Sequence, residues 1–370
     1  MKFVHTSDWQ LGMAAASVGA AGARVREERL AAGARVVQCA VEEKAEALVV
    51  AGDLFESNAV ERSLVSRAAE ILAAFPRPVI IIPGNHDPYV PGSVWTHPLW
   101  AKYPHIQLAL DPAPIALPEG TFFPCPLKES FSRRDPTAWI SAEDCEKPAI
   151  GLAHGNVEGL PGEAPEFPIP RNAAARAKLD FLALGHWHSF APFADDDGVV
   201  RMAYSGTHEQ TKFGERSAGQ ALLVEVKERH APPAIRELVT GRLRWMTRTD
   251  TLRQPGDTAR LMKELEEIPQ PESTLLRLEL SGWIFAGDRG LLEQLATFLE
   301  ERFLYSRVER EGLLPAPEDH GWLEGLAEGP VRRSGELLLA KANDPGQSEF
   351  DRRAAERALL LLLQLTRREI

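Results

Sequence analysis

The chain has 370 residues, of which 44% are hydrophobic and 26% are charged, and its formal net charge is −11. This length predicts two or three domains, and the composition is that of an ordinary globular protein, which excludes a largely disordered chain. The acidic balance argues against a surface that binds nucleic acid over its whole extent, although it allows local binding at clusters of arginine.

The sequence also predicts the compartment and the state of the thiols. No apolar run approaches the roughly 20 residues that a membrane-spanning helix needs, and the first residues lack the basic and apolar parts of a signal peptide. We therefore expect no membrane contact and a cytoplasmic location. Cys39, Cys125 and Cys145 have neither the even number of a disulfide framework nor the spacing of a zinc ribbon, so we expect ordinary thiols.

Strand and helix signals alternate over the first 90 residues. In chain order they predict a strand over 3–7, a helix over 24–47, a strand over 48–51, a helix over 61–75 and a strand over 80–82. A stretch of small residues ends at Ala23 and predicts a mobile loop over the ends of these strands. The alternation as a whole predicts an α/β core.

The next part of the chain is less regular. Residues 90–148 are rich in proline and carry strand signals near 106–110 and 122–123. Beyond Val199 the strand signals lie closer together. They fall over 201–204, 221–226 and 235–239, and they predict the antiparallel completion of a second sheet.

A change of pattern over 241–251 predicts a separate α+β unit, followed by helices. The elements predicted in that unit are a helix over 258–265, a strand over 276–280, a helix over 290–303 and a strand over 305–309. The last helix begins at Ser348, with Asp351 completing a capping box, and Leu359–Leu363 places leucine on every face. Two interpretations stay open: this helix packs on a preceding helix over 322–339, or it docks to a partner.

Five apolar runs in the first 190 residues end abruptly in groups that can hold a metal ion. In chain order these groups are Asp8 with Gln10, Asp53, Asn85 with His86 and Asp87, His154, and His186 with His188. The carboxyl ends of parallel strands meet at one edge of a sheet, so the sequence predicts one convergent metal site.

The chemistry of these groups indicates which ions they suit. Carboxylates, imidazoles and amides without a thiolate suit Mn²⁺, Fe²⁺ or Mg²⁺ at least as well as Zn²⁺. If Asp53 is shared, the site can hold two metals about 4 Å apart, which activate a bridging hydroxide and clamp a phosphoryl group. His86, held by Asp87 as an imidazolium, would protonate the leaving oxygen.

At this point the motifs resemble those of a known family. Asp8-x-Gln10, Gly52-Asp53, Gly84-Asn85-His86-Asp87, His154 and Gly185-His186-x-His188 look like the five blocks of the calcineurin-like metallophosphoesterases. The opening over 5–12, the extension over 52–56, and Tyr204-Ser205-Gly206 with Phe213 and Glu215 resemble more narrowly the SbcD-like DNA repair exonucleases. The resemblance covers about residues 1–245.

The resemblance implies a fold and a division of the chain. The implied fold is α/β (α+β), with a two-sheet β-sandwich flanked by helices and a dimetal site at the strand ends. The implied domains are a nuclease domain over 1–245, a capping domain over 250–312 and a helical tail over 316–370 that binds an SMC-like ATPase. Members of the family commonly form homodimers.

The resemblance also implies roles for the site residues. One metal would be held by Asp8, Asp53 and His188, and the other by Asp53, Asn85, His154 and His186. His86 would be the acid supported by Asp87, and Tyr204 and Ser205 would bind substrate. The implied activity is Mn²⁺-dependent 3′ to 5′ exonuclease and single-strand endonuclease action in DNA double-strand-break repair.

One residue departs from the pattern. Most of the family has a histidine where this chain has Gln10. An amide oxygen is a harder and weaker donor than imidazole, so the first metal should bind less tightly or shift towards hard cations, unless Gln10 holds a metal-bound water instead.

The motifs leave alternatives to a nuclease. A phosphodiesterase or phosphatase for a nucleotide or other small ester is favoured by the acidic charge, whereas the capping unit, the helical tail and the arginine clusters favour DNA. A binding subunit weakened by Gln10 is a third interpretation, and intact Asp53, His86 and Asp87 argue against it. The residues after Asp53 do not follow the pattern of protein phosphatases.

Overall fold

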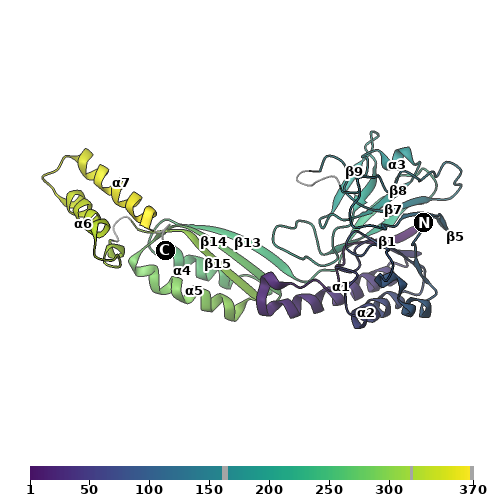
Figure 1. Cartoon of the computed structure of the whole chain (residues 1–370), viewed down its shortest axis with the longest axis horizontal. Coiled ribbons are helices and arrows are strands. Elements are labelled where there is room, and N and C mark those ends of the chain that lie inside the picture. The colour runs from purple at the N-terminus through teal and green to yellow at the C-terminus, as the bar shows by residue number, and fades with distance from the viewer. Residues whose placement is uncertain (161–165, 317–319, 367–370) are drawn as a thin grey trace. The chain divides into compact units, whose positions relative to one another are not determined.

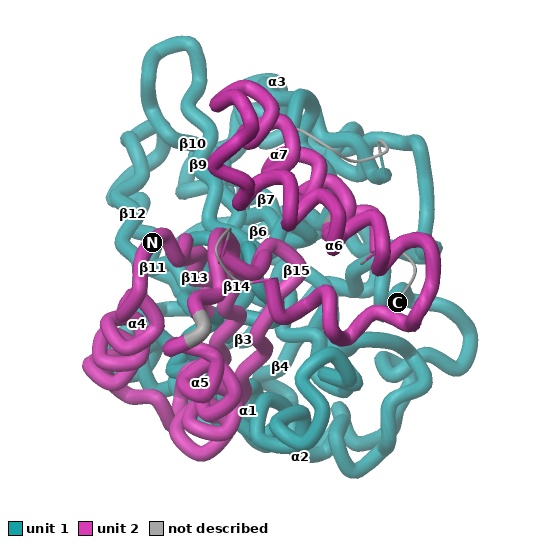
Figure 2. Tube along the Cα trace, turned by 90° about the vertical axis from the view of Figure 1, so that its left-hand side faces the viewer, with its two compact units in different colours: residues 1–245 teal, residues 246–370 magenta. Residues whose placement is uncertain are grey.

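The computed structural model describes residues 1–160, 166–316 and 320–366. The chain forms two compact units, Met1–Trp245 and Met246–Ile370, which Figure 2 distinguishes by colour. Each unit has its own sheet structure and hydrophobic core.

The first unit contains two six-stranded sheets. The first sheet has the order β12-β11-β1-β2-β3-β4. Its strands are β1 (Lys2–Thr6), β2 (Ala47–Ala51), β3 (Val79–Ile82), β4 (Ile106–Leu108), β11 (Gln220–Glu225) and β12 (Ala234–Val239). The strands β1 to β4 are parallel, and β2 and β3 are buried along their whole length, which explains their unbroken apolar sequences.

The second sheet has the order β5-β6-β7-β8-β10-β9. Its strands are β5 (Ile115–Leu117), β6 (Gly120–Cys125), β7 (Ala149–His154), β8 (Phe181–Gly185), β9 (Ala191–Ala194) and β10 (Val200–Tyr204). The four central strands are parallel, and β5 and β9 add antiparallel edges.

Two predicted strands belong to a different sheet from the one expected. We predicted that 221–226 and 235–239 complete the second sheet, but β11 and β12 extend the first one, with Phe3 of β1 opposite Val224 of β11. The physical reason is the outer edge of β1, whose backbone groups need partners and receive them from the returning hairpin. Only the segment over 201–204 joins the second sheet, and it does so parallel to β8.

The two sheets face each other and helices cover their outer sides. Between the sheets lies a core of large apolar side chains, which includes Phe3, Ile80, Phe122, Ile150 and Phe181. The helices α1 (Gly22–Glu42) and α2 (Arg62–Ala73) lie side by side over the first sheet, and the short α3 (Ala173–Arg176) packs on the second (Figure 1). The predicted α/β sandwich flanked by helices is therefore confirmed.

The segment before α1 is only in part the loop that we expected. It includes the 3₁₀ helix η1 (Ala16–Ala21), in which Val18 and Ala21 are buried. The side chain of Arg26 in α1 donates to the carbonyl oxygen of Ala14 at 2.8 Å. This stretch is thus fastened to the helix that follows it.

The second unit contains a three-stranded sheet with helices on one face. Its elements are β13 (Arg244–Leu252), whose first two residues belong to the first unit, α4 (Asp257–Glu266), β14 (Thr274–Ile284), α5 (Arg289–Arg302) and β15 (Tyr305–Pro315). Leu276, Leu278 and Leu280 alternate along β14 and bury against leucines of α4 and α5, as the period of two predicts. The strands β14 and β15 run further than the sequence indicated.

Two helices end the described chain, α6 (Pro330–Asn343) and α7 (Glu349–Thr366), and they lie side by side (Figure 1). The predicted cap of α7 is present, since the Asp351 backbone donates to Ser348 Oγ at 3.1 Å. Leu359 and Leu363 are buried, but Leu361 and Leu365 are 59% and 62% exposed. The helix therefore packs on its neighbour along one face and leaves leucines uncovered on another.

All three cysteines are free thiols, as we expected from their number and spacing. Within residues 1–160, 166–316 and 320–366, none of the helices has the length and apolar character needed to cross a bilayer.

Candidate metal centre

The register of the strands brings the predicted ligands to one edge. In the first sheet His5 lies opposite Val49, and Val49 lies opposite Ile80, so the loops after β1, β2 and β3 emerge together. In the second sheet His154 at the end of β7 lies opposite Gly185 at the end of β8. A hydrogen bond of 2.8 Å between His154 Nδ1 and the Ala51 carbonyl oxygen joins the two edges.

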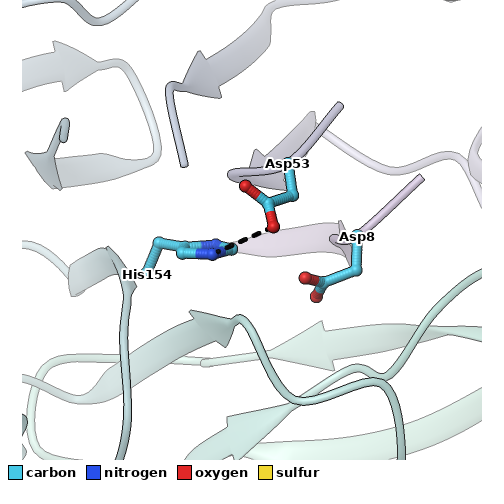
Figure 3. Close-up of side chains that lie close together, drawn as sticks. All are labelled: Asp8, Asp53 and His154. Atoms are coloured by element: carbon cyan, nitrogen blue, oxygen red, sulfur yellow. Dashed lines mark ion pairs between the residues drawn. The ribbon is translucent and has the colours of Figure 1, made fainter. Parts of the chain in front are cut away.

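Asp8, Asp53 and His154 form the centre of this arrangement. Each offers one ligand atom, and these atoms all lie within 4.8 Å of one another (Figure 3). His154 Nε2 lies 3.4 Å from an oxygen of Asp53, and all three side chains are buried.

Asn85, which follows β3, connects this centre to His186, which follows β8. Its Oδ1 lies 2.8 Å from His154 Nε2 and 3.0 Å from His186 Nδ1. The structure thus brings together Asp53, Asn85, His154 and His186, the set that the resemblance implied for one metal.

Asp8 belongs to the other implied set, and neighbouring groups hold its carboxylate. The backbone N–H of His186 donates to the Asp8 carboxylate at 3.1 Å, and the Ser7 hydroxyl donates to it as well. Gln10 and His188 line one cleft together with Asp53, and Gln10 is almost fully buried.

Four of the candidate ligands have left-handed backbone conformations, which non-glycine residues rarely adopt. The φ angles are 54° at Asp8, 39° at Gln10, 52° at Asp53 and 109° at His186. Each such residue costs of order 1–3 kcal/mol and persists only where its surroundings hold it. Here the Gln10 N–H donates to the Asp53 carbonyl at 2.9 Å, so the two strained loops support each other. Backbone strain concentrated just after the carboxyl ends of these strands points to function.

Two glycines leave the space that the central side chains need. A Cβ on Gly84 would lie 2.1 Å from Asp53 Oδ1. Gly52 has a φ of +86°, and a Cβ there would lie 2.3 Å from His154 Nδ1. The motif glycines are therefore required by the close approach of the backbone to the carboxylate and the imidazole.

The electrostatics of this centre suit a cation. Burial by itself would raise the pKa of Asp53, but the neighbouring His154 lowers it to about 2. Burial would likewise lower the pKa of His154, but Asp53 raises it to about 9. Without a metal, a proton on His154 balances the buried Asp53 carboxylate. A second carboxylate, Asp8, is buried beside it, so a divalent cation that displaced this proton would fit the donor set.

His86 and Asp87 do not interact as we expected. The Asp87 carboxylate accepts backbone N–H groups of Phe55 at 2.9 Å and Gly84 at 2.7 Å, and burial followed by the nearby Asp53 raises its pKa to about 8. His86 Nδ1 instead lies 3.1 Å from the carbonyl oxygen of Glu56. The expected support of His86 by Asp87 is corrected, because Asp87 is occupied in shaping the loop that carries Asn85.

These side chains open onto a cleft of about 970 Å³. Gln10, Asp53, Asn85, His86, His186 and His188 are among the residues that line it. The cleft also has Trp187, Lys212 and Phe213 on its walls, so an apolar and a basic surface adjoin the candidate ligands.

Comparison with known proteins agrees with this geometry. The sequence pattern that defines the family described as calcineurin-like phosphoesterase matches residues 1–190 of the chain. The chain is a calcineurin-like phosphoesterase. The family binds divalent metal ions in a dimetal site and hydrolyses phosphate esters, and the chain carries a candidate for such a site.

Two curated relatives of this phosphoesterase are similar over part of their length. The uncharacterized metallophosphoesterase YhaO of Bacillus subtilis is 28% identical over 176 residues, 45% of this chain and 42% of that protein. The SbcD subunit of the nuclease SbcCD of Staphylococcus epidermidis is 25% identical over 245 residues, 58% of this chain and 63% of that protein. The chain therefore spans less than two thirds of either relative.

Solved structures give more distant likenesses to the phosphoesterase. The protein TT1561 of Thermus thermophilus is 12% identical, with a TM-score of 0.40, and the likeness covers 65% of this chain and 98% of that one. Vps29 of Entamoeba histolytica, complexed with zinc, is 13% identical, with a TM-score of 0.30, and covers 65% of this chain and 99% of that one.

Tyr204 and Ser205, expected to bind substrate, are fully buried in the phosphoesterase. The Tyr204 hydroxyl donates to the Gly155 carbonyl at 2.6 Å and accepts the Val157 N–H at 2.8 Å. Ser205 Oγ lies 3.0 Å from Ser7 Oγ, which in turn donates to Asp8. The expectation of substrate contact is corrected, because both side chains support the loops beneath the site.

The sequence did not indicate which other side chains of the phosphoesterase hold the candidate ligands in place. Arg29 of α1 is fully buried and donates to the carbonyl oxygens of Asp8 at 3.2 Å and Glu209 at 2.9 Å, which fastens the Asp8 loop. Glu215 lies 2.9 Å from His188 Nδ1. The motif around Glu215 was visible in the sequence, but nothing local to Arg29 indicated its contacts.

Proposed function

We propose that this phosphoesterase is a dimetal-dependent DNA nuclease that removes nucleotides in the 3′ to 5′ direction and acts in the repair of double-strand breaks. The observation that supports it most is that candidate ligands from five strand ends lie together, with His86 on the wall of the adjoining cleft. Such a constellation is built to bind and cleave a phosphodiester.

The donor set divides between two cations, for which Mn²⁺ is our first choice. Asp8, Gln10 and His188 would hold one, Asn85, His154 and His186 would hold the other, and Asp53 would be shared. Divalent cations held by these residues would polarise the phosphoryl oxygens and lower the pKa of water. Backbone N–H groups already hold both carboxylates, that of His186 on Asp8 at 3.1 Å and that of His86 on Asp53 at 3.0 Å.

His86 is our candidate for the general acid. Its Nδ1 lies against the Glu56 carbonyl oxygen, which can only accept, so Nδ1 carries a proton. In the protonated ring Nε2 also carries one, and this is the atom that can donate to the leaving oxygen. His86 lines the cleft, where a phosphodiester would lie.

Two observations favour DNA as the substrate. The similarity to the SbcD subunit of the nuclease SbcCD covers 58% of this chain, and the chain adds an α+β unit over 250–312 that we propose as a cap. By analogy with a relative named as one subunit of a complex, we propose that the helical tail over 316–370 binds an SMC-like ATPase, with exposed Leu361 and Leu365 at the contact.

A second candidate function is hydrolysis of a nucleotide or other small phosphate ester. The net charge of −11 favours it, because a long polyanion is repelled by an acidic surface. The two functions differ in substrate size and share the same centre.

The decisive experiment measures nucleotide release from a 3′-labelled linear duplex with Mn²⁺, beside cleavage of bis-p-nitrophenyl phosphate. We compare wild type with Asp53→Ala and with a control, Asp197→Asn, whose carboxylate is exposed in the turn after β9. Degradation of DNA by wild type and control, but not by Asp53→Ala, supports the nuclease. Cleavage of the small diester alone would contradict the DNA assignment.

A further inference from the structure

The side chains of Glu215 and His188 are hydrogen-bonded to each other, and neighbouring groups hold the Glu215 carboxylate. Glu215 Oε1 lies 2.9 Å from His188 Nδ1, and the Glu215 side chain is 3% exposed. The Thr211 N–H donates to Oε2 at 2.7 Å, and the Thr211 hydroxyl donates to Oε1. The carboxylate is thus held on both oxygens and has little freedom to turn away.

The loop that carries Glu215 is itself braced. Gln210 Nε2 donates to the Glu215 backbone carbonyl at 3.1 Å, while Gln210 Oε1 accepts the backbone N–H of Trp245 at 3.3 Å. The rings of Phe213 and Trp245 meet edge to face, with centroids 5.0 Å apart. These contacts lie within the first unit and place the carboxylate before any ligand is present.

The hydrogen bond determines which nitrogen of His188 can bind a metal. A carboxylate accepts, so the Nδ1 atom that faces it carries the proton, and Nε2 keeps its lone pair. Histidines that bind metals commonly donate their other N–H to a carboxylate, which orients the ring and makes it a stronger donor. His188 lines the cleft beside Gln10 and Asp53.

The substitution at Gln10 makes this support more important in this chain. Of the residues proposed for the first cation, which are Asp8, Gln10, Asp53 and His188, only His188 is an imidazole. An amide oxygen at Gln10 is a weak donor, so the strength of the set depends on how well His188 is oriented.

We propose that Glu215 is a positioning residue that fixes the tautomer and orientation of His188 for the first cation. This inference rests on the proposed dimetal site. It assigns Glu215 no contact with substrate, and its effect on metal binding passes through His188 alone.

The test is a double-mutant cycle on metal affinity, measured by calorimetric titration of the metal-free full chain with Mn²⁺. Glu215→Gln keeps the shape of the side chain and removes its charge, and His188→Ala removes the ligand. We expect Glu215→Gln to weaken the affinity of one of two Mn²⁺ ions by about 10- to 100-fold. In the His188→Ala background the same change should have no further effect.

Asp180→Asn is the matched control. It removes the charge of a buried carboxylate that precedes β8, at the end of the strand away from His186, and that accepts the backbone N–H groups of Ala149 at 2.7 Å and His230 at 2.6 Å. It should leave both Mn²⁺ affinities as in wild type.

The outcomes separate the two proposals. Absence of Mn²⁺ binding by wild type would overturn the dimetal site itself. Two bound ions in wild type with unchanged affinities in Glu215→Gln would overturn the positioning role alone. Equal weakening in the presence and absence of His188 would also overturn it, because the effect would then not pass through that ring. If Glu215→Gln proves unstable, Thr211→Val is the second variant. It removes the hydroxyl that donates to the Glu215 carboxylate and that lies 3.4 Å from His188 Nδ1. It should give a smaller loss in the same direction, and an unchanged affinity would contradict the proposal.

Discussion

The space beside Gly84 offers a sharp test of how closely the site is built. Replacing Gly84 by alanine adds one methyl group, whose carbon would lie 2.1 Å from Asp53 Oδ1 and 2.5 Å from the Asp53 backbone nitrogen. Ordinary contacts begin near 3.4 Å, and the backbone nitrogen cannot rotate away. Either the loop after β3 or the loop after β2 must therefore move by about 1 Å.

The magnitude follows from that displacement. Adding a methylene to a close-packed interior costs about 1–3 kcal/mol of unfolding free energy. A shift of about 1 Å in a catalytic group costs about 100-fold in rate. Since Gly84 also donates its N–H to Asp87 at 2.7 Å, the movement extends to the loop that carries Asn85 and His86.

The assay is Mn²⁺-dependent turnover of bis-p-nitrophenyl phosphate, beside denaturant unfolding of the same samples. Gly290→Ala is the control, because a Cβ at that position in α5 meets nothing within 4 Å. We expect kcat/KM to fall at least about 100-fold for Gly84→Ala and to stay unchanged for Gly290→Ala. Turnover of Gly84→Ala close to that of wild type would refute the argument that Asp53 must lie where the structure has it.

Three further predictions concern single side chains. Gln10→His should raise Mn²⁺ affinity, because imidazole is a stronger donor than an amide oxygen, and an unchanged titration would contradict this. His86→Asn should abolish most turnover while both Mn²⁺ ions still bind, and loss of binding would show that His86 is not simply the acid. Burial lowers the pKa of His5 to about 3, opposed by its hydrogen bond to the Leu184 carbonyl. As pH falls, His5 is therefore protonated in the unfolded chain before it is protonated in the folded one. Below about pH 6.5 the free energy of unfolding then decreases, by up to about 1.4 kcal/mol per pH unit. His5→Gln should reduce that slope in unfolding measured between about pH 7 and 5.5, and an identical slope would be evidence against it.

Glu215, Glu56 and Arg29 share a role that the ligand motifs do not reveal. Each contacts a candidate site residue without being a candidate ligand itself, through a carboxylate, a backbone carbonyl and a guanidinium respectively. Variation at Glu215 and Arg29 would change the site without changing any candidate ligand, whereas Glu56 acts through its backbone. They are therefore the places to examine when relatives with the same motifs differ in metal preference.

The sequence by itself determined the local elements and the order in which their ends deliver polar groups. The run Val79–Ile82 is a strand because its β-branched side chains suit a sheet buried on both faces, and the polar residues after it have to leave that sheet at its edge. The same argument holds for the runs before Asp8, Asp53, His154 and His186. Parallel pairing then makes one convergent edge the natural result.

Only the tertiary structure decided which of these groups touch one another. Asp87 follows His86 directly, yet it turns to the N–H groups of Phe55 and Gly84, because a buried carboxylate needs donors and two backbone donors lie within reach. The hairpin β11–β12 pairs with β1, far away in sequence, because an open strand edge needs partners and composition cannot say which edge is open. Local propensity acts over a few residues, whereas hydrogen-bond satisfaction and packing are settled by whatever the fold brings near.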